Sequence, residues 1–260
     1  RREPDGSWAL TSPISSPADA RATELFLNEL TSAHALRFVT DPAESKALST
    51  RLEAPALRLS VEGSSGGSAL VVGEPIEGLE GARVRPAKVE GLPVVFLVDE
   101  SFVSLLTHAE SRLRDRRLLV FEPASITSIE IHDLDDRLSL HKLEDGRWDA
   151  LHLDADGQLT QRPGDEQSIN EFLRALRTLE TLTFVTDAPS LDDLKTYGLH
   201  PPERTLVLKR NNDSKLTLHL GKYSESASGH YAGREQGGYV FTADENLRGL
   251  LQPSILQFRQ

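Results

Sequence analysis

Two segments of the chain carry apolar residues at the spacing of an α-helix. In the first segment they are Ala22, Leu25, Phe26, Leu30 and Ala33, and in the second they are Ile169, Phe172, Leu173, Leu176 and Leu179. Intervals of three and four residues place side chains on one face of a helix, so each segment predicts an amphipathic helix. Ser16 before Pro17 and Gly164-Asp165 are the expected helix starts, the first with a hydroxyl cap and a proline at the first helical position.

Short apolar stretches between turn-forming residues predict antiparallel hairpins. The predicted strands cover residues 57–61, 69–72, 94–98, 125–132, 137–143, 147–153, 205–209, 215–220 and 239–242. The glycine-serine stretch at 63–67 is expected to be a hairpin loop rather than an interdomain linker, because Asn211-Asn212-Asp213 occupies the matching place. A last helix of the first half is predicted from Glu100 to about Arg116.

The chain repeats its own pattern, which predicts two copies of one module. Asp5-Gly6-Ser7-Trp8 returns as Asp145-Gly146-Arg147-Trp148, and Phe38-Val39-Thr40-Asp41 returns unchanged at residues 184–187. The separation is 140 residues (148 minus 8) for the tryptophans and 146 (184 minus 38) for the phenylalanines. We therefore expect a first repeat at residues 1–118, which lacks its N-terminal strands, and a second repeat at residues 119–260.

The order of the predicted elements favours an α+β fold. Strands occur in hairpins, without the regular alternation of strand and helix that builds a parallel sheet. Each repeat is expected to be an antiparallel sheet of hairpins packed with one longer helix and short helices. Because the chain opens part-way through a repeat and contains no methionine, we expect it to be an internal piece of a longer protein.

The net charge argues against two classes of binding partner. Lys and Arg number 29 against 40 Asp and Glu, which gives a formal charge of -11 at pH 7. Such a field repels phosphate backbones and anionic headgroups, so we expect no nucleic-acid binding and no direct hold on a membrane surface. No stretch approaches the roughly 18 apolar residues of a spanning helix. Membrane attachment is expected only through an anchor absent from this chain.

Histidines gather in the predicted meander between residues 125 and 153. If its strands pair around their turns, the side chains that share one face are Glu130, His132, His141 and His152. Imidazole and carboxylate groups together can bind zinc or another divalent metal. A solvated outer face, with Ile129 turned inward, explains the same pattern and is the interpretation we favour, so the metal site at the three histidines is the weaker alternative.

No catalytic motif is recognisable, so we expect a protein that is not an enzyme and needs no cofactor. The chain has no cysteine, no Gly-x-Ser-x-Gly nucleophile elbow and no phosphate-binding loop. Residues 154–157 resemble the opening of a calcium loop but lack its third acidic position and closing glutamate, so a tight turn is expected there. A recognition surface is the remaining candidate, because tyrosine and arginine are favoured at interfaces. Its residues are Tyr197, Gly198, Leu199, Tyr231, Arg234 and Tyr239.

Two motifs carry a resemblance to a known family. They are Leu113-Arg114-Asp115-Arg116-Arg117-Leu118-Leu119, followed by Phe121, and the run Leu194-Lys195-Thr196-Tyr197-Gly198-Leu199-His200-Pro201-Pro202. With Asp145-Gly146-Arg147-Trp148 in the expected order, the chain resembles the bacterial domain of unknown function 4340 (DUF4340). The first copy departs from the pattern, because residues 48–55 keep Leu and Pro but lack Tyr-Gly.

The resemblance implies a cellular context rather than a chemistry. It implies a membrane-anchored protein on the extracytoplasmic side of the inner membrane, in the periplasm, that works with an ABC-type transport system of the gliding-motility group. The expected function is a non-enzymatic interaction module, and its expected partners are ABC-type transporter subunits or other envelope proteins. Two alternatives stay open: a cell-envelope glycan- or peptide-binding protein or hydrolase, and a purely structural scaffold.

Overall fold

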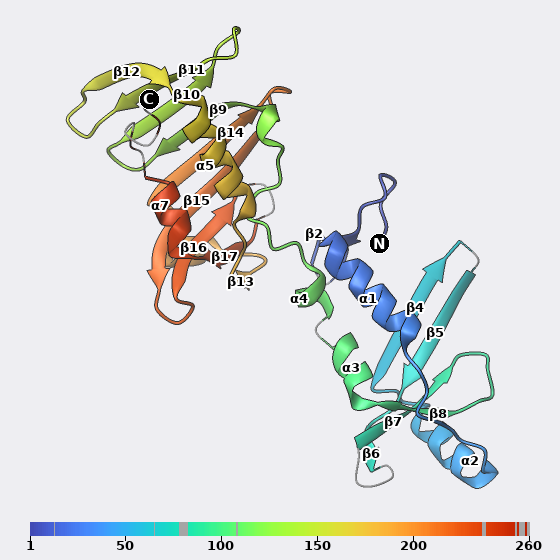
Figure 1. The fold of residues 1–260 in the computed structure, drawn as a ribbon. Coiled ribbons are helices and arrows are strands. Elements are labelled where there is room, and N and C mark those ends of the chain that lie inside the picture. The colour runs from blue at the N-terminus through green and yellow to red at the C-terminus, as the bar shows by residue number, and fades with distance from the viewer. Residues whose placement is uncertain are drawn as a thin grey trace. The chain divides into compact units, whose positions relative to one another are not determined.

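The chain folds into two compact units. The structure is a computed structural model and describes residues 1–12, 14–64, 66–77, 83–107, 109–235, 238–252, 254 and 258. The units are Arg1–Asp115 and Arg116–Gln260 (Figure 1). The first unit ends at Asp115, and Leu118 and Leu119 are buried in the core of the second unit. The N–H of Leu118 also donates to the carbonyl of Leu179 at 3.0 Å.

The first unit is built around a small antiparallel sheet. Its elements are β1 (Ala9–Leu10), β2 (Ser16–Pro17), α1 (Ala20–Ser32), β3 (Arg37–Phe38), α2 (Pro42–Arg51), β4 (Leu57–Gly63), β5 (Gly66–Val72), β6 (Ile76–Glu77), β7 (Arg83–Val89), β8 (Phe96–Asp99), α3 (Glu100–Leu106) and α4 (Ala109–Leu113). The strands β3-β8-β7-β5-β4 lie side by side in this order, β6 pairs with β7, and β1 and β2 form a separate pair. Gly63 pairs with Gly66 across the glycine-serine stretch, which agrees with the predicted hairpin, and Ser65 of that stretch lies outside the described residues.

Both faces of this small sheet are covered in part. One face packs Val71 and Leu97 against Leu48 of α2 and against Leu52, which directly follows that helix. The opposite face packs Val72, Ala87 and Val98 against Val103 of α3, and Arg85 on β7 anchors that helix through an ion pair with Glu100 at 2.8 Å. The first unit therefore holds two small cores, one on each side of its sheet.

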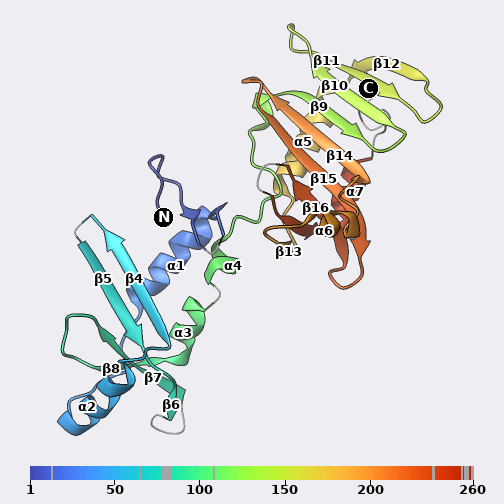
Figure 2. The same cartoon turned by 180° about the vertical axis from the view of Figure 1, so that it is seen from behind.

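The second unit has a larger sheet. Its elements are η2 (Pro123–Ser125), β9 (Ile126–His132), β10 (Arg137–Lys142), β11 (Trp148–Leu153), β12 (Leu159–Gly164), α5 (Glu166–Thr178), β13 (Thr183–Thr186), α6 (Leu191–Thr196), β14 (Arg204–Arg210), β15 (Lys215–Ser224), β16 (Gly229–Arg234), β17 (Val240–Ala243) and α7 (Glu245–Leu250). The described strands form one nine-stranded antiparallel sheet in the order β12-β11-β10-β9-β14-β15-β16-β17-β13. In Figure 1, α5 and α7 lie in front of this sheet, and α6 comes to the front in Figure 2.

A single continuous core lies between this sheet and α5. Rows of buried residues run straight across the strands: Ile131 of β9 pairs with Leu206 of β14, and Leu206 pairs with Leu218 of β15. The face of α5 that was predicted to be buried does pack here, through Ile169, Phe172, Leu173 and Leu176. Asp165 caps this helix, as expected, by accepting from the N–H of Ser168 at 2.9 Å.

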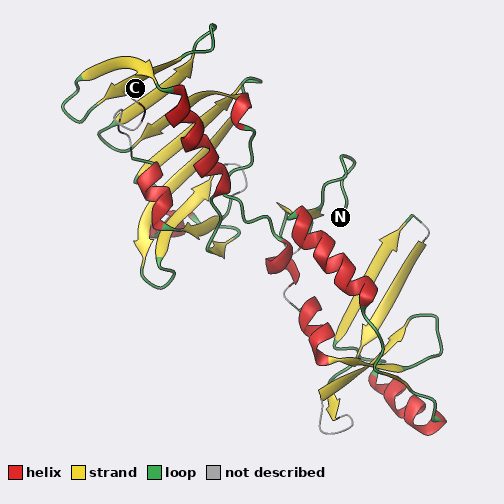
Figure 3. Ribbon diagram, in the orientation of Figure 1, coloured by secondary structure: helices red, strands yellow, loops and turns green. Residues whose placement is uncertain are grey.

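The sheets of the two units follow the same strand order. From one edge, the first unit reads β3-β8-β7-β5-β4 and the second reads β13-β17-β16-β15-β14. The helices α1 and α5, which precede these two sets of five strands in the chain, both have 13 residues. The larger sheet then continues past β14 with β9, β10, β11 and β12, whereas the described sheet of the first unit ends at β4. Figure 3 shows both units as antiparallel sheets with helices packed on them, which is the expected α+β class.

Two helix predictions are wrong. The helix expected from Glu100 to about Arg116 is two shorter helices, α3 and α4, because Thr107 adopts an extended conformation (φ -73°, ψ 132°) that ends the first. The expected start at Ser16-Pro17 is instead the short strand β2. The carboxylate of Asp19 caps α1 by accepting from the N–H of Ala22 at 2.7 Å. Among the described residues, every helix is too short or too polar to cross a membrane.

Candidate functional site

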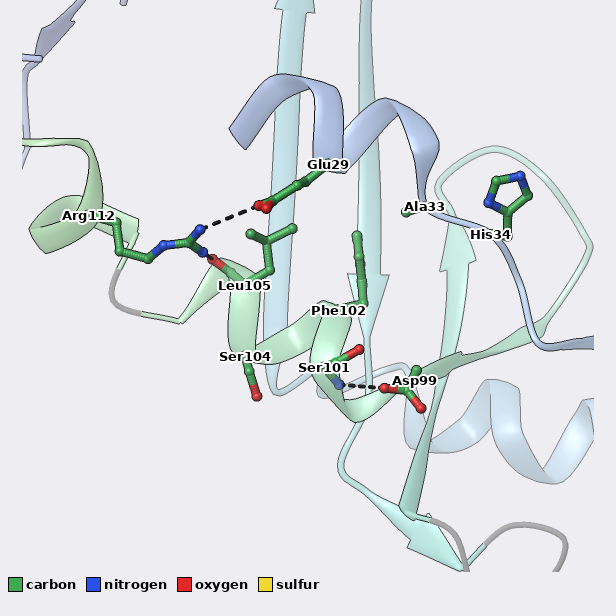
Figure 4. A pocket seen from close by; sticks show the side chains of 9 residues that line it. All are labelled: Glu29, Ala33, His34, Asp99, Ser101, Phe102, Ser104, Leu105 and Arg112. Atoms are coloured by element: carbon green, nitrogen blue, oxygen red, sulfur yellow. Dashed lines mark hydrogen bonds and ion pairs between the residues drawn. The ribbon is translucent and has the colours of Figure 1, made fainter. Parts of the chain in front are cut away.

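An open groove lies under α1 in the first unit. Two neighbouring cavities of about 540 Å³ and about 320 Å³ share the wall formed by Ala33, His34 and Phe102. Figure 4 shows the first cavity between the C-terminal end of α1 and the start of α3, with β4 and β5 behind it. The second extends from there along the sheet. We call the two cavities together the α1 groove.

The mouth of the α1 groove is polar, but its charged groups are already paired. Glu29 on α1 contacts Arg112 on α4 at 3.4 Å, and Arg112 also donates to the carbonyl of Leu105 at 3.2 Å (Figure 4). Asp99 accepts from the N–H of Ser101 at 2.7 Å, and its hydrogen bonds to Ser101 lower the pKa of its carboxyl group. These carboxylates hold helices in place, because Glu29 ties α1 to α4 and Asp99 caps α3.

The floor of the α1 groove is apolar. The side chains that line it come from α1 and from strands β4, β5 and β8, and include Leu27, Leu30, Leu59, Val61, Leu70, Phe96 and Val98. Val61 is 50% exposed. On α1, Thr23 is buried whereas the apolar side chains facing the sheet are only partly so. An apolar surface left accessible beneath a helix is typical of a binding groove.

The sequence marked most of these residues as core rather than as a site. Leu30 and Phe102 fall on the apolar faces of predicted helices, and Leu59, Val61, Leu70 and Phe96 fall within predicted strands. The apolar pattern of these segments is the same for a buried core and for the floor of a groove, so it does not distinguish the two.

Four of the six predicted recognition residues come together on the second unit. The rings of Tyr197 and Tyr231 lie 4.5 Å apart between centroids. Gly198 follows in the left-handed conformation (φ 70°) that glycine adopts readily. Leu199 is buried and covers Gly233, where an added Cβ would lie 3.6 Å from its Cδ1.

The remaining two recognition residues lie elsewhere. Arg234 pairs with the buried Leu218 on the core side of the sheet, and its guanidinium stands 4.7 Å from the centroid of the Tyr239 ring. Tyr239 belongs to the core of the second unit. Tyr231 alternates with the buried Ala232 and projects from the opposite face. The six residues therefore divide between two faces of one sheet.

The idea that three histidines share one face is wrong for His152. His152 pairs with Leu138 and faces the core side, whereas His132 pairs with Arg137 on the outer side. His141 is on that outer side too but stands four residues beyond Arg137 on β10 (141 minus 137), about 13 Å away along the strand. Ligands of one metal ion must lie within about 2 Å of it. Across the described part of the chain, no group of three His, Asp or Glu side chains is placed to hold a metal ion.

A different histidine pair occupies the outer face. His132 and His219 flank Thr205 across β9, β14 and β15, and His219 Nδ1 lies 3.1 Å from the Thr205 hydroxyl. Burial lowers the pKa of both histidines below the ordinary value, an effect that Glu235 partly opposes at His219. The folded protein therefore favours their neutral forms.

This pair predicts a loss of stability in mild acid. The unfolded chain takes up protons at a pKa of about 6.5, above that of either folded histidine, so protonation favours unfolding. Stability is fully present above this value and falls as the pH drops from it towards the folded pKa. We expect the urea concentration at the unfolding midpoint of the second unit to be lower at pH 5 than at pH 7.5. We expect this decrease to be smaller in a His219→Gln variant. An equal fall in both proteins would contradict the assignment.

Comparison with known proteins assigns the family. The model of the family described as "Domain of unknown function (DUF4340)" matches residues 8–192, well over half of the 260-residue chain. The match runs without a break through the first unit into the second, and it includes Leu113 to Phe121 and Asp145-Gly146-Arg147-Trp148 but not Tyr197-Gly198-Leu199. No curated protein and no solved structure matches the chain. On the family match, this chain belongs to the DUF4340 family.

Proposed function

We propose that this chain is a non-enzymatic protein-interaction module that binds through the α1 groove. The observation that carries this proposal is the exposed apolar floor of the groove, where Val61 is 50% exposed beside Leu59 and Leu70. A surface of this kind stabilises a complex when a partner removes it from water, at about 25 cal/mol per Å² of apolar area. The paired state of Glu29 and Asp99 at its mouth supports binding rather than hydrolysis.

We further propose the cellular setting that the family resemblance implies. In it, the module is displayed on the extracytoplasmic side of the inner membrane by an N-terminal anchor, and its partner is a subunit of an ABC-type transport system. The net charge of -11 supports a protein partner over an anionic membrane surface or a nucleic acid.

Co-purification with two matched variants tests this function. The full-length protein is recovered from its own membranes in mild detergent, and transporter subunits are identified by mass spectrometry. Leu27→Ser changes the α1 groove, whereas Leu25→Ser changes the same residue type on the same helix at a position 54% exposed and outside the groove. We expect Leu27→Ser to reduce recovery of the subunit and Leu25→Ser to preserve it. If the wild-type protein brings down no transporter subunit, the proposal fails.

A further inference from the structure

The strands β9 to β12 form a meander at one edge of the large sheet (Figure 1). Residues 133–136 join β9 to β10, and residues 154–158 join β11 to β12. Arg137, which follows the first of these turns, pairs with Leu153, which precedes the second. The two turns therefore lie at the same end of the sheet. We call residues 133–137 and 153–159 together the meander tip.

The meander tip exposes three leucines. Leu134 is 79% exposed, Leu159 is 64% exposed and Leu153 is 41% exposed. Leu153 and Leu159 are opposed across β11 and β12, so their side chains project from the same face. It is the outer face, because Ala150, three residues before Leu153 on β11, belongs to the core and side chains alternate between faces. Apolar side chains grouped in this way on a surface are typical of an interaction site.

The net negative charge of the second unit is concentrated on the meander. Residues 126–164 hold nine Asp and Glu against four Lys and Arg, a formal charge of -5 (4 minus 9). The remainder of the second unit holds 14 acidic and 13 basic residues, a formal charge of -1 (13 minus 14). The meander tip contains one basic residue, Arg137, and five aspartates, which are Asp133, Asp135, Asp136, Asp154 and Asp156.

Two of these aspartates are available to a cationic partner. Among the described residues, the carboxylates of Asp135 and Asp156 have no hydrogen-bond or ion-pair partner, and both residues are exposed. The turns that carry them are fixed, because Asp133 accepts from the N–H of Asp136 at 2.8 Å and Asp154 accepts from the N–H of Gln158 at 2.8 Å. Binding to a surface that is already ordered loses little conformational entropy.

The combination of leucines and unpaired aspartates restricts the kind of partner. An uncharged apolar surface would bury the aspartates without a counter-charge, which is unfavourable. A second copy of this chain that used the same tip would bring like charges together, as would an anionic lipid or a nucleic acid. A metal ion would leave the leucines uncovered, and no three carboxylates or imidazoles in the described part of the chain are placed to hold one. A segment with apolar side chains on one face and Lys or Arg beside them matches both features.

We propose that the meander tip binds a basic, amphipathic segment of a partner protein. The apolar side chains of that segment cover Leu153 and Leu159, and its Lys or Arg side chains pair with Asp135 and Asp156. Opposite charges speed the encounter, and burial of the leucines stabilises the complex. This surface belongs to the second unit, so the inference goes beyond the proposed function, which concerns the α1 groove of the first.

A synthetic peptide of leucine and lysine is the probe. It has roughly 14 residues, with leucine on one face of a helix, and is titrated into the 260-residue protein with fluorescence anisotropy as the readout. Hydrogen exchange then locates the contact. We expect saturable binding and slower exchange of the amides of the meander tip. We also expect the affinity to fall at least about fivefold between about 50 mM and about 300 mM NaCl, because salt screens exposed charges. A peptide with glutamate in place of lysine is expected not to bind.

Leu159→Ser tests the apolar part of the contact. We expect it to weaken binding of the peptide about tenfold, as the loss of a central apolar contact does in protein interfaces. Leu143→Ser is the matched control, because Leu143 is 44% exposed and directly follows β10 at the opposite end of the meander. We expect this control to change the affinity less than about threefold. Both leucines are exposed, so neither substitution is expected to unfold the protein.

A double variant, Asp135→Ser with Asp156→Ser, tests the charged part. We expect it to bind the peptide about fivefold more weakly and with a smaller dependence on salt, because two exposed ion pairs are lost. The control is Glu144→Ser with Glu225→Ser, which removes the same charge from exposed positions outside the meander tip. We expect the affinity of this control to change less than about twofold.

The proposal is wrong if the basic peptide does not bind, or if Leu159→Ser or the double aspartate variant binds it as tightly as the wild type. Protection from exchange confined to residues outside the meander tip would contradict it too. Calcium alone, at about 5 mM, that protected the tip as the peptide does would assign the aspartates to a cation instead. These outcomes are independent of the co-purification test of the α1 groove, which changes residues of the first unit.

Discussion

Leu206→Ala is expected to lower the free energy of unfolding of the second unit by about 2–5 kcal/mol, the range for emptying a well-packed core position. Leu206 is fully buried and lies between Ile131 on one neighbouring strand and Leu218 on the other. The surrounding strands are fixed by pairing on both sides, so they cannot close the cavity. Native-state hydrogen exchange of the amides of β15 measures the effect.

Leu59→Ala is the matched control in the first unit. Leu59 pairs with Leu70 on one side but has no described strand on the other, and its side chain lines the groove. The substitution deletes the same atoms as Leu206→Ala, but from a partly solvated site. We therefore expect the free energy of unfolding of the first unit to fall by about 1 kcal/mol or less, as measured by hydrogen exchange of the amides of β5. Equal losses at the two positions would mean that the β4 edge is already covered in solution.

Gly221→Ala is expected to detach the Tyr197-Gly198-Leu199 segment from the sheet. A Cβ at this position would lie 2.3 Å from the carbonyl oxygen of Tyr197 and 3.0 Å from the carbonyl carbon of Gly198. Both are backbone atoms, and the Tyr197 carbonyl accepts from the N–H of Lys222 at 2.9 Å. The Tyr197 carbonyl would have to move away from the new Cβ, which strains or breaks this hydrogen bond. We expect a destabilisation of about 1–3 kcal/mol, the usual cost of overpacking.

The measurement for Gly221→Ala is again local. Faster exchange of the Lys222 amide, together with loss of the Tyr197 and Tyr231 ring contact in NMR spectra, reports the detached segment. Gly249→Ala is the control, because Gly249 lies within α7 and an added Cβ there meets no atom within 4 Å. Alanine favours helix, so we expect this control to be unchanged or more stable by about 0.5–1 kcal/mol. Gly221→Ala behaving like the control would show that the segment is not docked on β15.

Features that depend on neighbouring residues were predictable from the sequence. The buried face of α5 and the hairpin of β4 with β5 follow from spacings of three or four residues and from alternation, which are properties of the local backbone. The capped start of α5 at Asp165 likewise needs only a side chain within reach of the first N–H groups. The α+β class follows from the order of such elements.

Features that depend on distant partners were not predictable. The meander was correctly expected, but the side of the sheet on which His152 lies depends on the register of β10 with β11, and one step of register reverses every side chain. The recognition residues likewise divided between two faces, because Arg234 and Tyr231 stand three residues apart on one strand. The break at Thr107 has no counterpart in the apolar periodicity of that segment.

The sequence by itself determined which side chains of this protein share one face of a helix or strand, because that grouping is set by the period of the local backbone. Only the tertiary structure decided whether another strand or helix packs against those side chains. Leu208 and Val61 occupy corresponding alternating positions, yet one is fully buried by β9 and the other is half exposed. Burial requires a second surface brought from elsewhere in the chain, and the pairing of distant strands is a property of the whole fold that no local pattern contains.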